Sequence, residues 1–271
     1  MIQKNIFLNN KSIGYKIAGQ GLPVVLIHGF AEDHDVWRYQ QDELLKHNYQ
    51  LIIPDLPGSN QSSMTEDMSI EGMVHSVKEI LNNESVSKCV MIGHSMGGYI
   101  TLAFAEKWAD QLLGFGLFHS TAFPDTEEKK ATRRKSIAFM QAHGADAFIR
   151  QSTPNLFTET FRNKNNQVIE EMMARYSSFD VQALVAYYEA MIYRPERIAV
   201  LQSFSKPVLF IIGRHDKAIS FEDSMKQCHL PQTANIHILD NSAHMGMWEE
   251  KEKSNQAILS YLEEVAQFTL E

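Results

Sequence analysis

Short runs of residues that are apolar at almost every position recur along the chain and constrain its fold more than any other feature. They lie at residues 24–27, 51–53, 89–92, 115–118, 208–212 and 236–239. Strands that are apolar on both faces are typical of parallel sheets, because helices cover both sides of such sheets. The runs therefore predict six buried strands in one mostly parallel sheet.

Helical periods separate these runs. Between 70 and 81 the apolar residues recur at the spacing of one helix face, and Ser69 before them is a suitable N-cap. A second period over residues 258–265 predicts a closing helix, and residues 2–8 and 12–18 predict an N-terminal hairpin. Strands that alternate with helices indicate an α/β fold with helices on both faces of the sheet.

Residues 121–195 interrupt the alternation. No buried-strand pattern occurs there, whereas an apolar stripe over 181–192 and a charged run over 125–135 predict helices. We interpret this segment as a helical cap inserted into a core of residues 1–120 and 196–271. Such a cap would lie over the carboxyl ends of the strands, where open α/β sheets bind their ligands.

The charge balance bears on partners and location. The chain has 25 lysine and arginine residues against 33 aspartate and glutamate residues, a net charge of −8. Negative charge repels phosphate backbones and anionic membranes, so we expect neither a nucleic-acid nor a membrane partner. The first residues lack the pattern of a signal peptide, and the two cysteines, Cys89 and Cys228, are too few for a disulfide framework. We therefore expect a cytoplasmic protein of undetermined oligomeric state.

Residues 93–98 read Gly-His-Ser-Met-Gly-Gly and contain the pattern G-x-S-x-G. The pattern directly follows the predicted strand at 89–92 and precedes helix-forming residues at 99–105. This setting is typical of a nucleophile elbow, a sharp turn that presents a serine hydroxyl above the sheet. The flanking glycines permit the strained backbone that Ser95 would need there. A glycine-rich turn without catalysis is the alternative interpretation.

A serine nucleophile needs a base within hydrogen-bond distance, and that base needs a third group to orient it. The chain has 11 histidines, so position must decide among them. His244 lies between the last predicted strand and the closing helix, and Asp216 follows the predicted strand at 208–212. Because parallel strands end at one edge of a sheet, we expect Ser95, Asp216 and His244 to meet there as a catalytic triad.

The chain order serine, aspartate, histidine resembles that of the α/β-hydrolase superfamily. Two further motifs fit the resemblance, His-Gly-Phe at 28–30 and Asp-Leu-Pro-Gly at 55–58. The resemblance implies the α/β-hydrolase fold, in an esterase- or haloperoxidase-like branch that combines a serine nucleophile with a helical cap. It also implies an oxyanion hole formed by the backbone N–H groups of Phe30 and Met96.

Three polar residues near these motifs are interpreted as structural. His28 is expected to support the loop that holds Phe30, and Asp240 fits the chemistry of a turn better than that of a partner for His244. Asn60 stands where members of the superfamily commonly have glycine. Asparagine tolerates the positive φ that such a turn requires, so we expect the turn to form.

Several residues are candidates for substrate contact, and each has a plainer interpretation. His119 and Trp37 would line the pocket, or else serve as a buried structural histidine and a core aromatic. Met191 would pack inside the cap and also form part of an adaptable apolar ceiling. Arg133 and Arg134 would contact an anionic substrate, or else belong to a solvated helix face.

Together these residues predict a serine hydrolase that cleaves a carboxylic ester through an acyl-enzyme on Ser95. The apolar cap indicates a small or medium hydrophobic ester as the substrate. We expect no metal or cofactor, because the sequence holds no Cys/His ligand set with metal spacing. C–C bond hydrolysis, perhydrolysis and lyase reactions on the same triad stay open, since the pocket decides among them. A hydrolase-like binding protein without catalysis is the other alternative.

Overall fold

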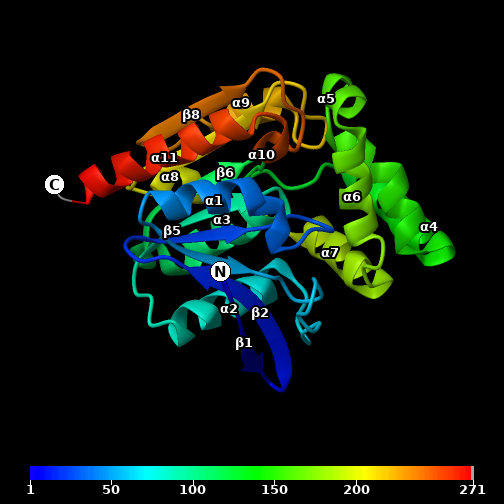
Figure 1. Ribbon diagram of the computed structural model, residues 1–271, viewed down its shortest axis with the longest axis horizontal. Coiled ribbons are helices and arrows are strands. Elements are labelled where there is room, and N and C mark those ends of the chain that lie inside the picture. Colours follow the sequence, from blue (N-terminus) through cyan, green and yellow to red (C-terminus); the bar gives the residue numbers. More distant parts are fainter. Residues whose placement is uncertain (270–271) are drawn as a thin grey trace.

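The structure is a computed structural model that describes residues 1–269, and an eight-stranded sheet forms its centre (Figure 1). The strands are β1 (Ile2–Leu8), β2 (Lys11–Ala18), β3 (Pro23–Ile27), β4 (Gln50–Pro54), β5 (Cys89–His94), β6 (Leu112–Phe118), β7 (Val208–Gly213) and β8 (Ala234–Leu239). Their order across the sheet is β1-β2-β4-β3-β5-β6-β7-β8. The pairs β1·β2 and β2·β4 are antiparallel, and every other pair is parallel. The mostly parallel sheet predicted from the sequence is confirmed.

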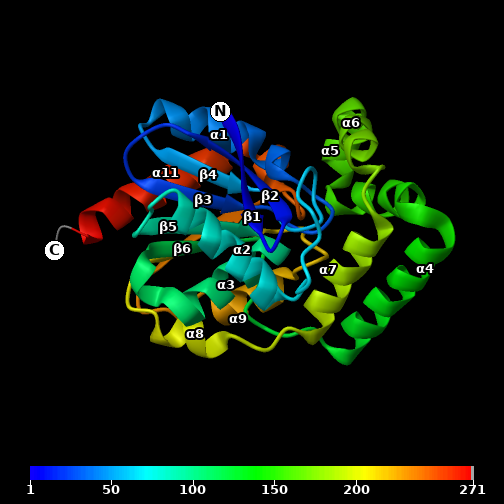
Figure 2. The same cartoon turned by 90° about the horizontal axis from the view of Figure 1, so that it is seen from below.

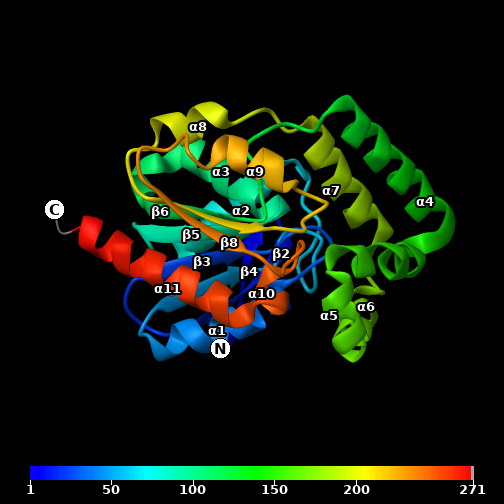
Figure 3. The ribbon, with the colours of Figure 1, turned by 90° about the horizontal axis from the view of Figure 1, so that it is seen from above.

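Helices cover both faces of this sheet, as predicted (Figures 2 and 3). One face carries α1 (Arg38–Lys46) and α11 (Lys251–Phe268), with the short α10 (Gly246–Glu249) leading into α11. The opposite face carries α2 (Ile70–Asn83), α3 (Met96–Trp108), α8 (Ile198–Ser203) and α9 (Phe221–Gln227). Within residues 1–269, every helix is too short or too polar to span a lipid bilayer.

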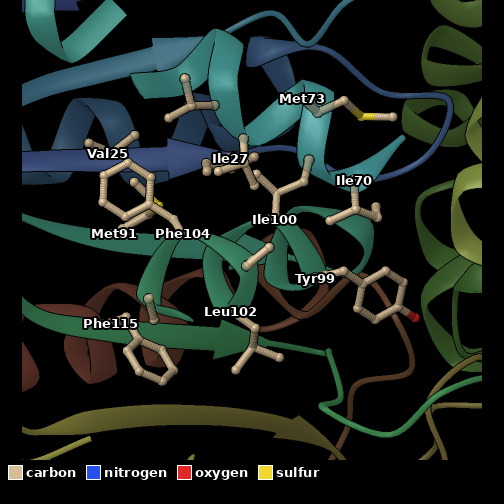
Figure 4. Packing of buried hydrophobic residues seen from close by; sticks show 14 of the residues in the cluster. Val25, Ile27, Ile70, Met73, Met91, Tyr99, Ile100, Leu102, Phe104 and Phe115 are labelled. Carbon is tan, nitrogen blue, oxygen red and sulfur yellow. The ribbon is translucent and has the colours of Figure 1, made fainter. Parts of the chain in front are cut away.

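Buried apolar side chains beneath α2 and α3 hold α3 against the sheet (Figure 4). Ile100 and Phe104 of α3 lie among the side chains of Val25 from β3 and Met91 from β5. All four side chains are fully buried. Burying an apolar side chain of this size contributes about 2 kcal/mol, so this packing holds α3 firmly against the strands.

Four helices between β6 and β7 form what we call the helical insertion. They are α4 (Glu127–Ser152), α5 (Glu159–Lys164), α6 (Asn166–Tyr176) and α7 (Val181–Tyr193), and they gather beyond one end of the strands (Figures 1 and 3). Helix α4 extends well beyond the charged run that predicts it and continues across a kink at Gly144, where φ is 85°. Only four of its 26 residues are buried, which explains why its apolar period is weak.

The loop after β4 forms its turn around asparagine instead of glycine. Asn60 has a φ of 48°, within the left-handed region. Its side-chain Nδ2 donates to Oδ2 of Asp55 at 2.8 Å. Asparagine is one of the few residues besides glycine that adopt this backbone at low cost, and its side chain adds a bond that glycine lacks.

We expect Asn60→Ala to lower the free energy of unfolding by about 1 kcal/mol more than Asn60→Gly does, because only alanine is strained at positive φ. Both variants lose the hydrogen bond to Asp55. The difference between their free energies of unfolding therefore reports the backbone strain alone. The midpoints of urea denaturation measure it. Equal midpoints for the two variants would contradict this account of the turn.

Candidate active site

Ser95 occupies a sharp turn between β5 and α3, with φ 52° and ψ −115°. Glycines make the turn possible because the backbone approaches its neighbours closely. A Cβ at Gly97 would lie 2.3 Å from the carbonyl oxygen of Ile27, and one at Gly98 would lie 2.2 Å from Oγ of Ser120. Ser95 therefore lies in a strained turn at the carboxyl end of a central strand, and its role as a nucleophile stays a prediction.

The loops after β7 and β8 bring two more side chains to Ser95. Nε2 of His244 lies 2.9 Å from Oγ of Ser95, and Nδ1 of His244 lies 2.8 Å from Oδ2 of Asp216. His244 and Asp216 are 4% and 7% exposed. The three residues, which are distant in the sequence, form one continuous hydrogen-bonded chain.

The environment of Asp216 keeps it ionised. Burial alone would raise its pKa, but the charge and hydrogen bond of His244 outweigh burial, and the pKa lies below its usual value. Its Oδ1 also accepts the backbone N–H groups of Ala218 at 2.8 Å and Ile219 at 3.0 Å. An ionised acceptor at Nδ1 favours the tautomer whose Nε2 lone pair faces the Ser95 hydroxyl.

A cavity of about 130 Å³ opens beside Ser95 and His244. Its lining includes Phe30 from the loop after β3, Arg133 from α4, and Met191 from α7. A second cavity of about 90 Å³ adjoins it and is mainly apolar, lined among others by Phe148, Ile149, Met172 and Met245. Met191 therefore lines the cavity beside Ser95, and its contact with a substrate stays a prediction.

The backbone N–H groups of Phe30 and Met96 have no protein acceptor within residues 1–269. The N–H of Met96 is the first of α3, where the helix dipole is positive. The ring of Phe30 stacks on Tyr188 with centroids 4.2 Å apart, which steadies the loop that carries its N–H. Two unpaired N–H groups beside a serine are what an oxyanion hole requires.

Two residues considered for substrate contact do not line this cavity. Trp37 is fully buried and packs edge-on against Phe118, with centroids 5.7 Å apart. His119 is buried behind Asp216, and its Nε2 accepts the N–H of Gly246 at 3.1 Å. Burial lowers the pKa of His119, so its ring is neutral. The structure therefore assigns Trp37 to the core and His119 to the support of the surrounding loops.

The structure also shows which of the other candidate residues line the cavity. Arg133 lines the cavity, whereas Arg134 beside it is exposed. His28 is buried away from the cavity and accepts the N–H of Leu56 at 3.0 Å. Asp240 pairs with Arg214 at the surface.

Within the described part of the chain, no three His, Cys, Asp or Glu side chains group so that they could hold a metal ion.

Glu32 is a site residue that the sequence analysis missed. Its buried Oε2 accepts the N–H of Gly29 at 2.6 Å and lies 3.0 Å from Nδ1 of His94. Nε2 of His94 lies 3.0 Å from the carbonyl oxygen of His244. A carbonyl only accepts, so Nε2 carries a proton, and a further proton must lie between Nδ1 and Glu32. The pair therefore ties the loop after β3 to the loop that holds His244.

The pKa of His94 reflects this pairing. Burial alone would lower it, but the charge of Glu32 and the hydrogen bond between the two raise it above its usual value. A raised pKa in the folded state stabilises the fold below the unfolded value of about 6.5. That stabilisation is lost as the pH rises through the folded value.

We expect Glu32→Gln to lower the free energy of unfolding by on the order of 2 kcal/mol at pH 6, because the charged His94 loses its partner. The difference from the wild type should shrink as the pH rises toward 9.5. Urea denaturation across this range measures it. Glu66→Gln, at an exposed position, is the matched control. A difference that grows with pH would refute the charged pair.

Comparison with known proteins extends these observations. Residues 23–115 match a family model described as alpha/beta hydrolase fold. The (E)-2-((N-methylformamido)methylene)succinate hydrolase of Acinetobacter baylyi is 24% identical over 270 residues, which are 97% of this chain and 99% of that protein. A thermophilic esterase from Thermogutta terrifontis has a TM-score of 0.91 and 27% identity, covering 98% of this chain and 99% of its own. An enol-lactonase from Burkholderia xenovorans has a TM-score of 0.88 and 20% identity, covering 96% and 100%.

Proposed function

Because the chain belongs to the α/β-hydrolase superfamily, we propose that it is a serine hydrolase that cleaves a carboxylic ester through an acyl-enzyme on Ser95. The observation that carries the proposal is the hydrogen-bonded chain from Ser95 through His244 to Asp216, with distances of 2.9 and 2.8 Å. Ser95 and His244 line a cavity bordered by the loop of Phe30, whose N–H has no acceptor within residues 1–269.

The proposed reaction has two halves. His244 takes the proton of Ser95 while Oγ attacks the ester carbonyl carbon, and the N–H groups of Phe30 and Met96 bind the resulting oxyanion. The carbonyl re-forms, the bond to the alkoxy oxygen breaks, and His244 gives its proton to the leaving alcohol. Water then attacks the acyl-enzyme, with His244 again as base, and releases the acid. Asp216 holds the imidazole tautomer and stabilises the imidazolium throughout.

We further propose that residues 121–195 act as a cap over a hydrolase core of residues 1–120 and 196–271. Tyr188 and Met191 support this role, because both belong to α7 and line the cavity beside Ser95. A cap that keeps water out strengthens the electrostatic interactions on which oxyanion binding depends.

We expect Ser95→Ala to abolish covalent labelling by a fluorophosphonate probe and to lower kcat for a reactive aryl ester by about 10⁴-fold or more. Labelling is read by gel fluorescence, and hydrolysis is read by release of the phenol. Labelling that persists in the variant would refute Ser95 as the nucleophile. Labelling of the wild type without hydrolysis of any ester would instead indicate a different reaction on the same residues.

We expect Asp216→Asn to lower kcat by about 10³- to 10⁴-fold, because asparagine favours the wrong tautomer of His244. Asp240→Asn is the matched control, since Asp240 is an exposed carboxylate that pairs only with Arg214 in the described chain. It should stay within twofold of the wild type. Equal effects of the two substitutions would contradict the role given to Asp216.

A further inference from the structure

The cavity beside Ser95 has a positive wall to which the proposed reaction gives no role. Lys129 and Arg133, four residues apart on α4, line the cavity together with Ser95 and His244. Their side chains are 34% and 14% exposed, so both cations are partly withdrawn from bulk water. Charge in such surroundings interacts strongly with an opposite charge that enters the cavity.

The carboxylate of Asp125 lies within ion-pair distance of three cations beside this wall. Oδ2 of Asp125 accepts from Nε of Arg133 at 2.5 Å. Its Oδ1 lies 3.0 Å from Nη2 of Arg194 and 4.0 Å from Nζ of Lys129. Asp125 and Arg194 do not line the cavity, so the two cations that face it are Lys129 and Arg133. The wall therefore favours an additional anion.

The acidic residue that lines the same cavity does not cancel the charge of these two cations. Glu32 already binds the N–H of Gly29 and the ring of His94. It belongs to the loop after β3, whereas Lys129 and Arg133 belong to α4. The cavity thus has an acidic group on its core side that is paired with His94. On its insertion side lie the ammonium of Lys129, which donates to the carbonyl oxygen of Ala218 at 2.7 Å, and the guanidinium of Arg133.

The guanidinium of Arg133 is held in place by protein groups. It lies over the ring of Tyr188, 5.2 Å from the centroid, and Tyr188 in turn stacks on Phe30. Asp125 binds its Nε edge, while Nη1 finds no acceptor within residues 1–269. A guanidinium that is fixed on one edge and free on the other is suited to a carboxylate ligand.

We propose that the substrate carries a carboxylate, which Arg133 binds with support from Lys129 while the ester carbonyl lies at Ser95. This inference rests on the proposed function and names its substrate class. The two adjoining cavities, of about 130 and 90 Å³, favour a short dicarboxylic half-ester or a small lactone that bears a carboxylate. Such a substrate replaces the hydrophobic ester expected from the sequence.

Monomethyl and dimethyl glutarate test the proposal, because they differ chiefly in the charge at one end. We expect the ratio of kcat/KM for the monoester to that for the diester to fall about 10- to 100-fold in Arg133→Gln. The loss should appear mainly as a raised KM for the monoester, since the carboxylate contact is equal in the ground and transition states. Arg133→Lys should retain part of the preference.

Arg134→Gln is the matched control, because Arg134 is the exposed neighbour of Arg133 on α4. It should keep the wild-type ratio. An unchanged ratio in a folded Arg133→Gln protein would overturn the carboxylate site. If Arg133→Gln does not fold, Lys129→Gln serves instead, with an expected fall of about 3- to 10-fold, and an unchanged ratio there counts equally against the site.

Calorimetric binding of free glutarate separates this inference from the proposed function. We expect Arg133→Gln to weaken glutarate binding at least about tenfold, and Arg134→Gln to leave it unaltered. If the wild type hydrolyses no ester, the ester hydrolase proposal fails, and the carboxylate site then stands or falls on this binding difference. Equal affinity in all three proteins would overturn the site.

Discussion

The first turn of α3 packs so tightly against the neighbouring backbone that no side chain fits between them, and the candidate site depends on this contact. A methyl group at Gly97 would collide with the carbonyl of Ile27, and one at Gly98 with Ser120. The close approach forces Ser95 into a backbone conformation that is costly for a residue with a side chain. Packing of α3 on the sheet offsets that cost. Backbone geometry therefore positions Ser95, the proposed nucleophile, and the loops after β7 and β8 only have to reach it.

A second, polar layer keeps those loops in register. Glu32 and His94 connect the loop after β3 to the backbone of His244, so the proposed oxyanion loop and the proposed base are joined by buried hydrogen bonds. Buried polar networks of this kind are stable only when every member is satisfied. The alignment of Ser95, His244 and Asp216 consequently depends on residues that do not touch the serine.

Much of this arrangement is predictable from the sequence, because the central strands β3 to β7 are buried on both faces and their apolar runs are nearly unbroken. The edge strand β8, which the same pattern predicts to be buried, is mostly only partly buried. The parallel strands end at one edge, so residues that follow them, such as Asp216 and His244, could be expected to meet. The pairing of Glu32 with His94 was not predictable, because the two lie 62 residues apart and neither belongs to a periodic pattern. The sequence also could not tell Arg133 from Arg134. Tertiary packing alone decides that Arg133 lines the cavity and that Arg134 is exposed.

The residues assigned to bond making and bond breaking belong to loops at the sheet edge, whereas Arg133, Tyr188 and Met191 belong to the helical insertion. The proposed reactivity and the proposed selectivity thus belong to separate stretches of the polypeptide. Under this proposal, substitutions in α4 and α7 change which substrate binds without altering the reaction at Ser95. Proteins that share these strand-end residues can therefore differ widely in the substrates they accept. A comparison of their helical insertions will say more about those substrates than a comparison of their sheets.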